Sequence, residues 1–327
     1  MTSSARSVVV GVAAAVVAGL CAAAQSRVNG TLAQEVGSGF AAAVVSFGSG
    51  LLVLGLALAC WPAARAAVGR VAAALRARRL RWWEVLGGAA GGFYVAAQGL
   101  TVGTLGVALF MVAVVAGQSV SSLLVDRLGI APGGVRLVTL GRALGPVLAV
   151  VAVGIAVSGS LDQVDRLWIA VVPFLAGAGQ AWQQAVNGRV RSAAETTSSS
   201  PFAGVAAATF GNFLVGTVVL LVALGVSVLV VGAPTGSLPT DLPLDLVLYA
   251  GGLLGICFIA IQAAVVHRIG VLLLGLGMIA GQIVGALVLD AVVPDAAAPG
   301  AAMYAGAALT LVAVVVPLVE ARLLGRR

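Results

Sequence analysis

Apolar residues fill ten long stretches of this chain, and short segments that hold most of the arginines separate them. An α-helix crosses the hydrocarbon core of a bilayer with about 20 apolar residues. In hydrocarbon such a helix satisfies its own backbone hydrogen bonds, as a spanning segment must. The pattern therefore predicts an all-α integral membrane protein with ten transmembrane helices, near residues 7–27, 40–61, 83–101, 104–126, 138–157, 166–187, 202–231, 245–266, 270–292 and 301–319.

Composition supports this class and removes others. Of the 327 residues, 61% are hydrophobic and only 9% are charged, whereas a soluble domain has about 25% charged residues. That excludes a soluble enzyme and a nucleic-acid-binding protein. The 44 glycines suit helices that pack closely in lipid.

The arginines indicate how the chain is oriented. If the N-terminus is cytoplasmic, the ten spans put 15 of the 18 basic residues on the cytoplasmic side, two outside (Arg27 and Arg166) and Arg142 just inside a span. The positive-inside rule then predicts an inner-membrane protein with both termini in the cytoplasm. Six arginines lie between residues 65 and 81. There we expect a short surface helix that anchors the topology, with a patch for anionic lipid as the alternative.

The chain repeats itself. Shifted by 164 residues, 87–126 aligns with 251–290 without a gap and with 15 identities in 40 positions. Bias toward Ala, Val and Leu does not explain the matched polar residues, which are Gln98 with Gln262, Gln118 with Gln282, and Asp126 with Asp290. Both aspartates are expected at span ends, within reach of water.

Earlier segments match as well. Gln25-x-x-x-Asn29 corresponds to Gln183-x-x-x-Asn187, and Ser46-Phe47-Gly48 to Thr209-Phe210-Gly211. Each copy holds five spans, an odd number, so the second copy would enter the membrane from the opposite side. Such inverted repeats are typical of transporters. We expect one five-helix repeat over residues 1–160 and the second over 161–327.

These matches resemble the YdcZ-like family of bacterial inner-membrane proteins, within the drug/metabolite transporter superfamily. The resemblance covers nearly the whole chain, in the fused two-copy form. It is carried by Gln25, Asn29-Gly30, Ser46-Phe47, Trp83, Gly87-Gly88, Gly91, Gly106, Gly117-Gln118 and Asp126. The resemblance implies a ten-helix bundle with a central cavity between the two halves, and it assigns no substrate.

Amide side chains are the main polar groups inside the predicted spans. The helical rise places Gln118 and Gln282 near mid-depth, and a buried amide costs a few kcal/mol unless it is paired. Partners would be solute, water or another helix, so each amide can equally be an interhelical hydrogen bond. The candidate solute-binding residues are Gln118, Gln282, Gln98, Gln262, Gln25, Gln183, Asn212 and Tyr94, the last as an aromatic wall.

These features favour a secondary transporter that moves a small neutral, zwitterionic or amphiphilic organic solute by alternating access. With one His and no Lys, neither a zinc site nor a GxxxxGK[ST] nucleotide loop is predicted, so we expect no cofactor, no metal and no enzyme activity. The expected partners are the solute and membrane lipid, with a homodimer as a further candidate assembly. The alternatives are a non-transporting structural or regulatory protein and a membrane-embedded lipid-handling protein.

Overall fold

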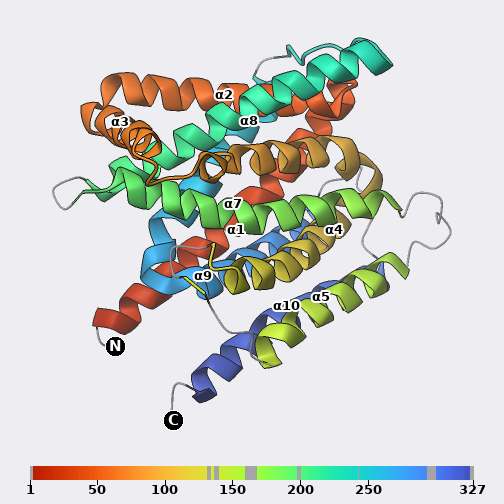
Figure 1. Cartoon of the computed structure of the whole chain (residues 1–327). Coiled ribbons are helices and arrows are strands. Elements are labelled where there is room, and N and C mark those ends of the chain that lie inside the picture. The colour runs from red at the N-terminus through yellow and green to blue at the C-terminus, as the bar shows by residue number, and fades with distance from the viewer. Residues whose placement is uncertain are drawn as a thin grey trace.

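The computed structural model describes residues 3–130, 134–135, 140–158, 168–196, 200–241, 243–292 and 300–324. Within these residues every regular element is a helix (Figure 1), which confirms the all-α class. The longer helices are α1 (Ser3–Val36), α2 (Gly39–Cys60), α3 (Pro62–Arg76), α4 (Gly87–Arg127), α5 (Leu140–Ser158), α7 (Val171–Ala194), α8 (Pro201–Val231), α9 (Gly251–Val292) and α10 (Ala301–Leu324). Short 3-10 turns are η1 (Trp82–Val85), η3 (Trp168–Ala170) and η4 (Leu244–Tyr249).

Several of these helices are long and apolar enough to cross a membrane. By length and hydropathy, four described stretches qualify: Val9–Val36, Gly39–Cys60, Trp82–Arg127 and Phe202–Val231. Shorter apolar helices cover Ala143–Ala156, Gly251–Val265, Gly277–Val292 and Ala301–Ala313. These lengths and compositions fit an integral membrane protein.

Helix α4 is a hairpin of two limbs, 87–105 and 107–127, that meet at Gly106. This glycine has φ 73° and ψ 164°, a backbone conformation that residues with a Cβ rarely adopt. The rings of Tyr94 and Phe110 lie 5.8 Å apart, although a continuous helix would separate these residues by about 24 Å. The chain therefore folds back at Gly106, where the sequence predicts two spans with a break at residues 102–103.

Helix α9 also reverses direction. The first part of α9 runs antiparallel to α1, because Gly251 contacts Asn29 and the later Gly255 contacts the earlier Gln25. The second part runs parallel to α1, because Gly277 contacts Ala15 and Gly285 contacts Ala23. The chain must therefore turn back between Gly255 and Gly277. Each repeat thus contains one hairpin at the same place in its sequence.

The two repeats exchange their first helices. The most extensive helix pairings are α1 along α9 and α7 along α4, so each first helix packs on the hairpin of the other repeat. Glycines allow these backbones to touch, as small residues do in membrane helices. A Cβ on Gly281 would meet the carbonyl oxygen of Val16, and one on Gly117 would meet that of Phe174.

The structure corrects one step of the repeat alignment. Gly252 lies against the backbone of Ser46, and its repeat equivalent Gly88 lies in the same way against Asn212. The ring of Phe47 stacks on that of Phe213 at 4.7 Å. The equivalent of Phe47 is therefore Phe213, three residues beyond the expected Phe210.

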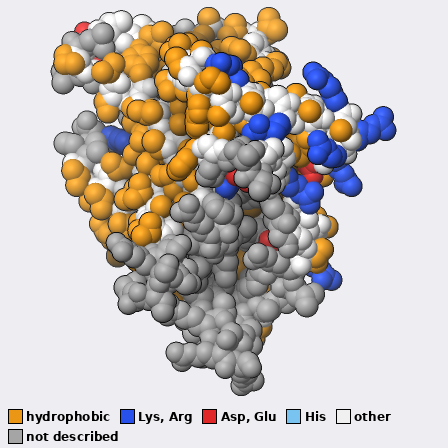
Figure 2. All heavy atoms as spheres, turned by 90° about the vertical axis from the view of Figure 1, so that its left-hand side faces the viewer, with side chains coloured by type: hydrophobic (Ala, Val, Ile, Leu, Met, Phe, Trp, Pro, Cys, Tyr) orange, Lys and Arg blue, Asp and Glu red, His pale blue; other side chains and the backbone are white. Residues whose placement is uncertain are grey.

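Arginines gather at the end of the bundle where both termini lie. In Figure 1 both termini are on the left, and Figure 2, which looks onto that end, shows arginine side chains gathered there. The expected surface helix is α3, which buries Ala64, Ala67 and Ala74. Part of the basic cluster caps helices: Arg65 donates to the carbonyl oxygen of Leu58 and Arg70 to that of Ala194. Basic side chains suit helix C-termini.

Candidate functional site

Three side chains of the first repeat form a closed hydrogen-bonded cluster, here called the closed triad: Ser26, Asn29 and Gln98. Asn29 Nδ2 donates to Gln98 Oε1 at 2.6 Å, and Gln98 Nε2 donates to Ser26 Oγ at 2.8 Å. All three residues are fully buried. The amide of Gln98 is therefore used at both ends, and it joins α1 to the first limb of α4.

The equivalent positions of the second repeat are Gln184, Asn187 and Gln262, here called the open triad. Together with Gly188, Ile259, Ala263 and Leu274 they line a small, partly open pocket of about 20 Å³, which is room for about one water molecule. The Nε2 atoms of Gln184 and Gln262 are buried without a hydrogen-bond partner. A buried unpaired amide costs about 1–3 kcal/mol. The same three positions are thus joined in one repeat and separated around a pocket in the other.

The predicted pair Gln25 and Gln183 takes equivalent places in the two repeats. Gln25 lies against Gly255 and donates to the carbonyl oxygen of Gly251 at 2.9 Å. Gln183 lies against Gly91, next to Asn212. Asn212 Nδ2 donates to Asn187 Oδ1 at 3.3 Å. Gln25 and Asn212 thus each make a hydrogen bond to another helix, and Asn212 reaches the open triad through Asn187.

Gln118 and Gln282, on the second limbs of the two hairpins, are deeply buried. The Oε1 atoms of both residues have no hydrogen-bond partner, nor has Nε2 of Gln282. Neither residue is among those that line the pocket. Their contact with solute stays a prediction.

Tyr94 lies beside the closed triad. Its ring lies nearly parallel to that of its repeat equivalent Phe258, with centroids 6.4 Å apart and 12° between the planes. The Tyr94 hydroxyl is near Ser26 and Gln98 of the closed triad. Ile259, beside Phe258, lines the pocket of the open triad.

The structure adds polar residues that the sequence does not mark as site residues. Ser26, Asn29, Gln184 and Asn187 complete the two triads, and the two asparagines could have been found because the repeat matches them. Gln180 is 1% exposed, and neither of its amide atoms has a hydrogen-bond partner. Its signal is its spacing from Gln184, because residues four apart share one face of a helix.

The two aspartates that the repeat matches lie at helix ends, as expected, and are largely buried there. Asp290 is 6% exposed, and its carboxylate accepts hydrogen bonds from the backbone N–H groups of Val107 and Ala108 at 3.3 and 2.7 Å. It therefore caps the second limb of α4. Asp126 is buried as well. Among the described residues, no three His, Cys, Asp or Glu side chains are grouped as metal ligands would be.

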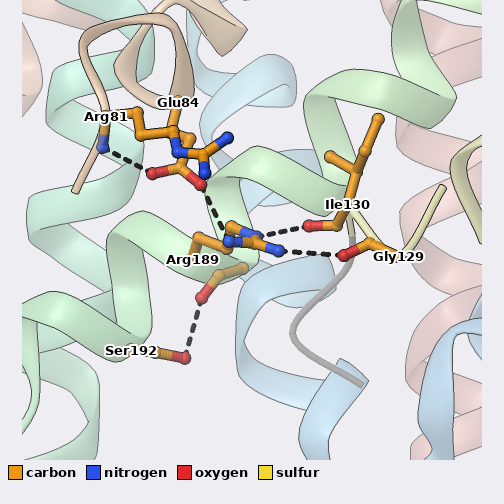
Figure 3. A network of polar contacts seen from close by, with 7 residues as sticks. Arg81, Glu84, Gly129, Ile130, Arg189 and Ser192 are labelled. Carbon is orange, nitrogen blue, oxygen red and sulfur yellow. Dashed lines mark hydrogen bonds and ion pairs between the residues drawn. The ribbon is translucent and has the colours of Figure 1, made fainter. Parts of the chain in front are cut away.

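An ion-paired network closes the arginine-rich end beside the pocket (Figure 3). Arg189 donates to Glu84 Oε1 and to the carbonyl oxygen of Gly129, each at 2.9 Å, and also to the carbonyl of Ile130. The other carboxylate oxygen of Glu84 accepts from the backbone of Arg81 at 2.6 Å. This single guanidinium thus ties the end of α7 to η1 and to the end of α4.

Comparison with known proteins agrees with the two-copy architecture. The model of the YdcZ family, described as inner membrane exporters of the drug/metabolite transporter type, matches residues 10–156 and again residues 168–316. No curated protein matches the chain. A solved structure, described only as the crystal structure of a protein, is similar with a TM-score of 0.53 and 19% sequence identity, over 93% of this chain and 98% of that one. That likeness concerns the fold alone. Because the family model covers most of the sequence in two copies, the chain belongs to the YdcZ family.

Proposed function

We propose that this protein is a secondary transporter that moves a small neutral, zwitterionic or amphiphilic organic solute across the inner membrane by alternating access. Membership of an exporter family supports transport. The observation that carries the mechanism is the difference between equivalent positions: Gln98 is hydrogen-bonded through both amide atoms, while Gln262 leaves its amide nitrogen unpaired beside a pocket.

The two repeats cross the membrane in opposite directions. This is supported by α1 and α7, the first helices of the repeats, which begin at opposite ends of the bundle (Figure 1). With two limbs each for α4 and α9, and one crossing each for α1, α2, α5, α7, α8 and α10, the chain makes ten crossings with both termini in the cytoplasm. The boundary between the repeats, near residue 160, falls outside the described residues.

Opposite orientation places the two triads toward opposite sides of the membrane. The pocket of the open triad includes Gly188, next to Arg189 at the arginine-rich end. Basic residues favour the cytoplasmic side, so the described arrangement is an inward-open state. If the repeats exchange conformations, the closed triad opens outward while the open triad closes.

The two conformations should have similar free energies, because the repeats are equivalent and one triad opens when the other closes. Breaking the closed triad loses two side-chain hydrogen bonds, each of which contributes about 0.5–1.5 kcal/mol. Joining the open triad in the same way would let the unpaired amide nitrogen of Gln262 donate to Gln184 Oε1. Two states of similar free energy can be biased by a solute that binds one of them better.

The polar lining indicates the charge of the solute. The pocket is lined by amides, glycine and aliphatic residues, and a bare ion buried there would be costly. Among the described residues, the buried charged groups Glu84, Asp126, Arg191 and Asp290 stand at or near helix ends. A solute with no net charge therefore fits best.

Site-specific labelling tests the mechanism without knowledge of the substrate. In a chain whose Cys21, Cys60 and Cys257 are replaced by alanine, single cysteines at Gln98 and Gln262 would be exposed to an impermeant maleimide. We expect Q262C to react from the cytoplasmic side and Q98C from the outer side, with a cysteine at fully buried Phe110 unreactive from both. Reaction of Q98C and Q262C from the same side would overturn alternating access. Failure of both to react would favour a solid, non-transporting bundle.

A further inference from the structure

Comparing the repeats shows which polar groups the fold itself does not require. The equivalent of Gln180 in the first repeat is Ala22, which is fully buried as well. The equivalent of Tyr94 in the second repeat is Phe258, also buried in the core. In each pair an apolar side chain occupies the matching place in the other repeat. The amide of Gln180 and the hydroxyl of Tyr94 are thus additions to a packing scheme that works without them.

These two additions lie next to each other at the centre of the bundle. The Tyr94 hydroxyl is near Gln180, yet neither Oε1 nor Nε2 of Gln180 has a hydrogen-bond partner. The hydroxyl itself has a long contact of 4.0 Å with the sulfur of Met111. Sulfur is a weak acceptor. The amide of Gln180 is therefore buried without a partner beside a hydroxyl that makes a weak contact with sulfur, and a further polar group there would satisfy the amide.

The surroundings define the chemistry of that partner. The polar side chains near the Tyr94 hydroxyl are Ser26, Gln98 and Gln180, all of them uncharged. A Gln amide both donates and accepts, so its best complement is another group that does both. The rings of Tyr94 and Phe258 stack on each other with centroids 6.4 Å apart, and they form an apolar boundary beside these polar groups.

We propose that Gln180 and Tyr94 form the polar contact for solute at the centre of the transport path. The solute class that fits is a neutral compound carrying adjacent hydrogen-bond donor and acceptor groups, such as a carboxamide or lactam. The inference rests on the proposed transport function and names the solute class for it.

Thermal stability separates a binding role from a structural one. Gln180→Met keeps the size of the side chain and removes an unsatisfied polar group, so its Tm should equal or exceed that of the wild type. Tyr94→Phe removes a hydroxyl that makes a weak contact with sulfur, so its Tm should change little. Gln98→Met is the matched control. It deprives Asn29 and Ser26 of their partner, so its Tm should fall by about 2–4 °C. A fall in Tm for Gln180→Met as large as that for Gln98→Met would overturn the proposal, because Gln180 would then hold the fold.

Ligand-induced stabilisation tests the solute class directly. With the purified full chain in lipid nanodiscs, millimolar benzamide should raise the Tm of the wild type. Acetophenone, which only accepts, and benzoate, which is charged, should not. The benzamide shift should be lost in Gln180→Met and reduced at least severalfold in Tyr94→Phe. No shift in the wild type, or an equal shift in Gln180→Met, would overturn the inference. The maleimide labelling uses no ligand, so it tests alternating access separately. If benzamide has no effect but the labelling pattern is as expected, the solute class is wrong and the proposed transport mechanism still stands.

Discussion

The carboxylate of Asp290, in the second repeat, accepts a hydrogen bond of 2.7 Å from the backbone N–H of Ala108, in the first. The first N–H groups of a helix have no partner within it, and a carboxylate placed there also interacts favourably with the helix dipole. One repeat therefore caps the hairpin of the other at its turn. The hairpin that carries Gln98 of the closed triad is held in this way from across the repeat boundary.

Removing this cap should destabilise the protein. We expect Asp290→Ala to lower the free energy of unfolding by about 1–2 kcal/mol, because the N–H groups of Val107 and Ala108 lose their acceptor. Asp290→Asn, which keeps an acceptor oxygen, should lose less. Thermal unfolding in detergent measures both variants. If Asp290→Ala has the same Tm as the wild type, the cap does not contribute to stability.

The hairpin turn itself depends on a glycine. Gly106→Ala should cost about 1–3 kcal/mol, because φ is 73° and ψ 164° there and a Cβ strains that conformation. Gly55→Ala is the control, since nothing lies within 4 Å of the place where its Cβ would be and alanine favours helix. The ratio of folded to aggregated protein on size-exclusion chromatography, together with Tm, would report the difference. Equal behaviour of the two variants would show that the turn tolerates a side chain.

Close contact between repeats depends on glycines too. A Cβ on Gly117 would meet the carbonyl oxygen of Phe174 in α7, so Gly117→Ala must push the two helices apart. We expect a loss of about 1–3 kcal/mol, seen as a lower Tm. Gly225→Ala in α8, where the space is open, should leave Tm unchanged or raise it. If Gly117→Ala leaves Tm unchanged, α4 and α7 can move apart without loss of stability.

The ion pair at the arginine-rich end should matter for stability. Glu84 is 2% exposed and Arg189 37%, so Arg189→Gln leaves a buried carboxylate without its cation. Because the arginine is partly solvated, we expect a loss of about 1–2 kcal/mol, below that of a fully buried pair. Arg189→Gln combined with Glu84→Gln should recover part of the loss. Arg79→Gln, exposed on the same face, serves as the control. If the loss of stability in the double variant equals the sum of the losses in the two single variants, Arg189 and Glu84 do not interact directly.

The sequence predicts the helical class and both repeats, because apolar length and matched polar residues are visible in one dimension. It does not fix which of several nearby glycines turns the hairpin. Gly99, Gly103 and Gly106 all lie within one apolar run, and only the backbone conformation selects Gly106. In the same way, Phe210 and Phe213 both suit the match to Phe47, and the ring contact decides for Phe213.

The site is predicted in part for a similar reason. Repeat matching finds Gln98 and Gln262, but their opposite states depend on contacts between helices that no sequence pattern contains. Gln180 escapes the same search because its equivalent is Ala22. A search for residues that are identical in both repeats does not find Gln180, because Gln180 is polar in one repeat only. Only the structure shows that the Gln180 side chain is buried and that its amide has no hydrogen-bond partner.

Opposite orientation of the two repeats is the claim on which the mechanism depends. Leu128 and Val292 are repeat equivalents at the ends of α4 and α9, and they are 69% and 72% exposed. In a chain without its native cysteines, Leu128→Cys and Val292→Cys can be treated in intact cells with a maleimide that cannot cross the inner membrane. We predict that Val292→Cys reacts at once and that Leu128→Cys reacts only after the membrane is permeabilised. If both residues react from the same side, the repeats are not inverted and alternating access of this kind is contradicted.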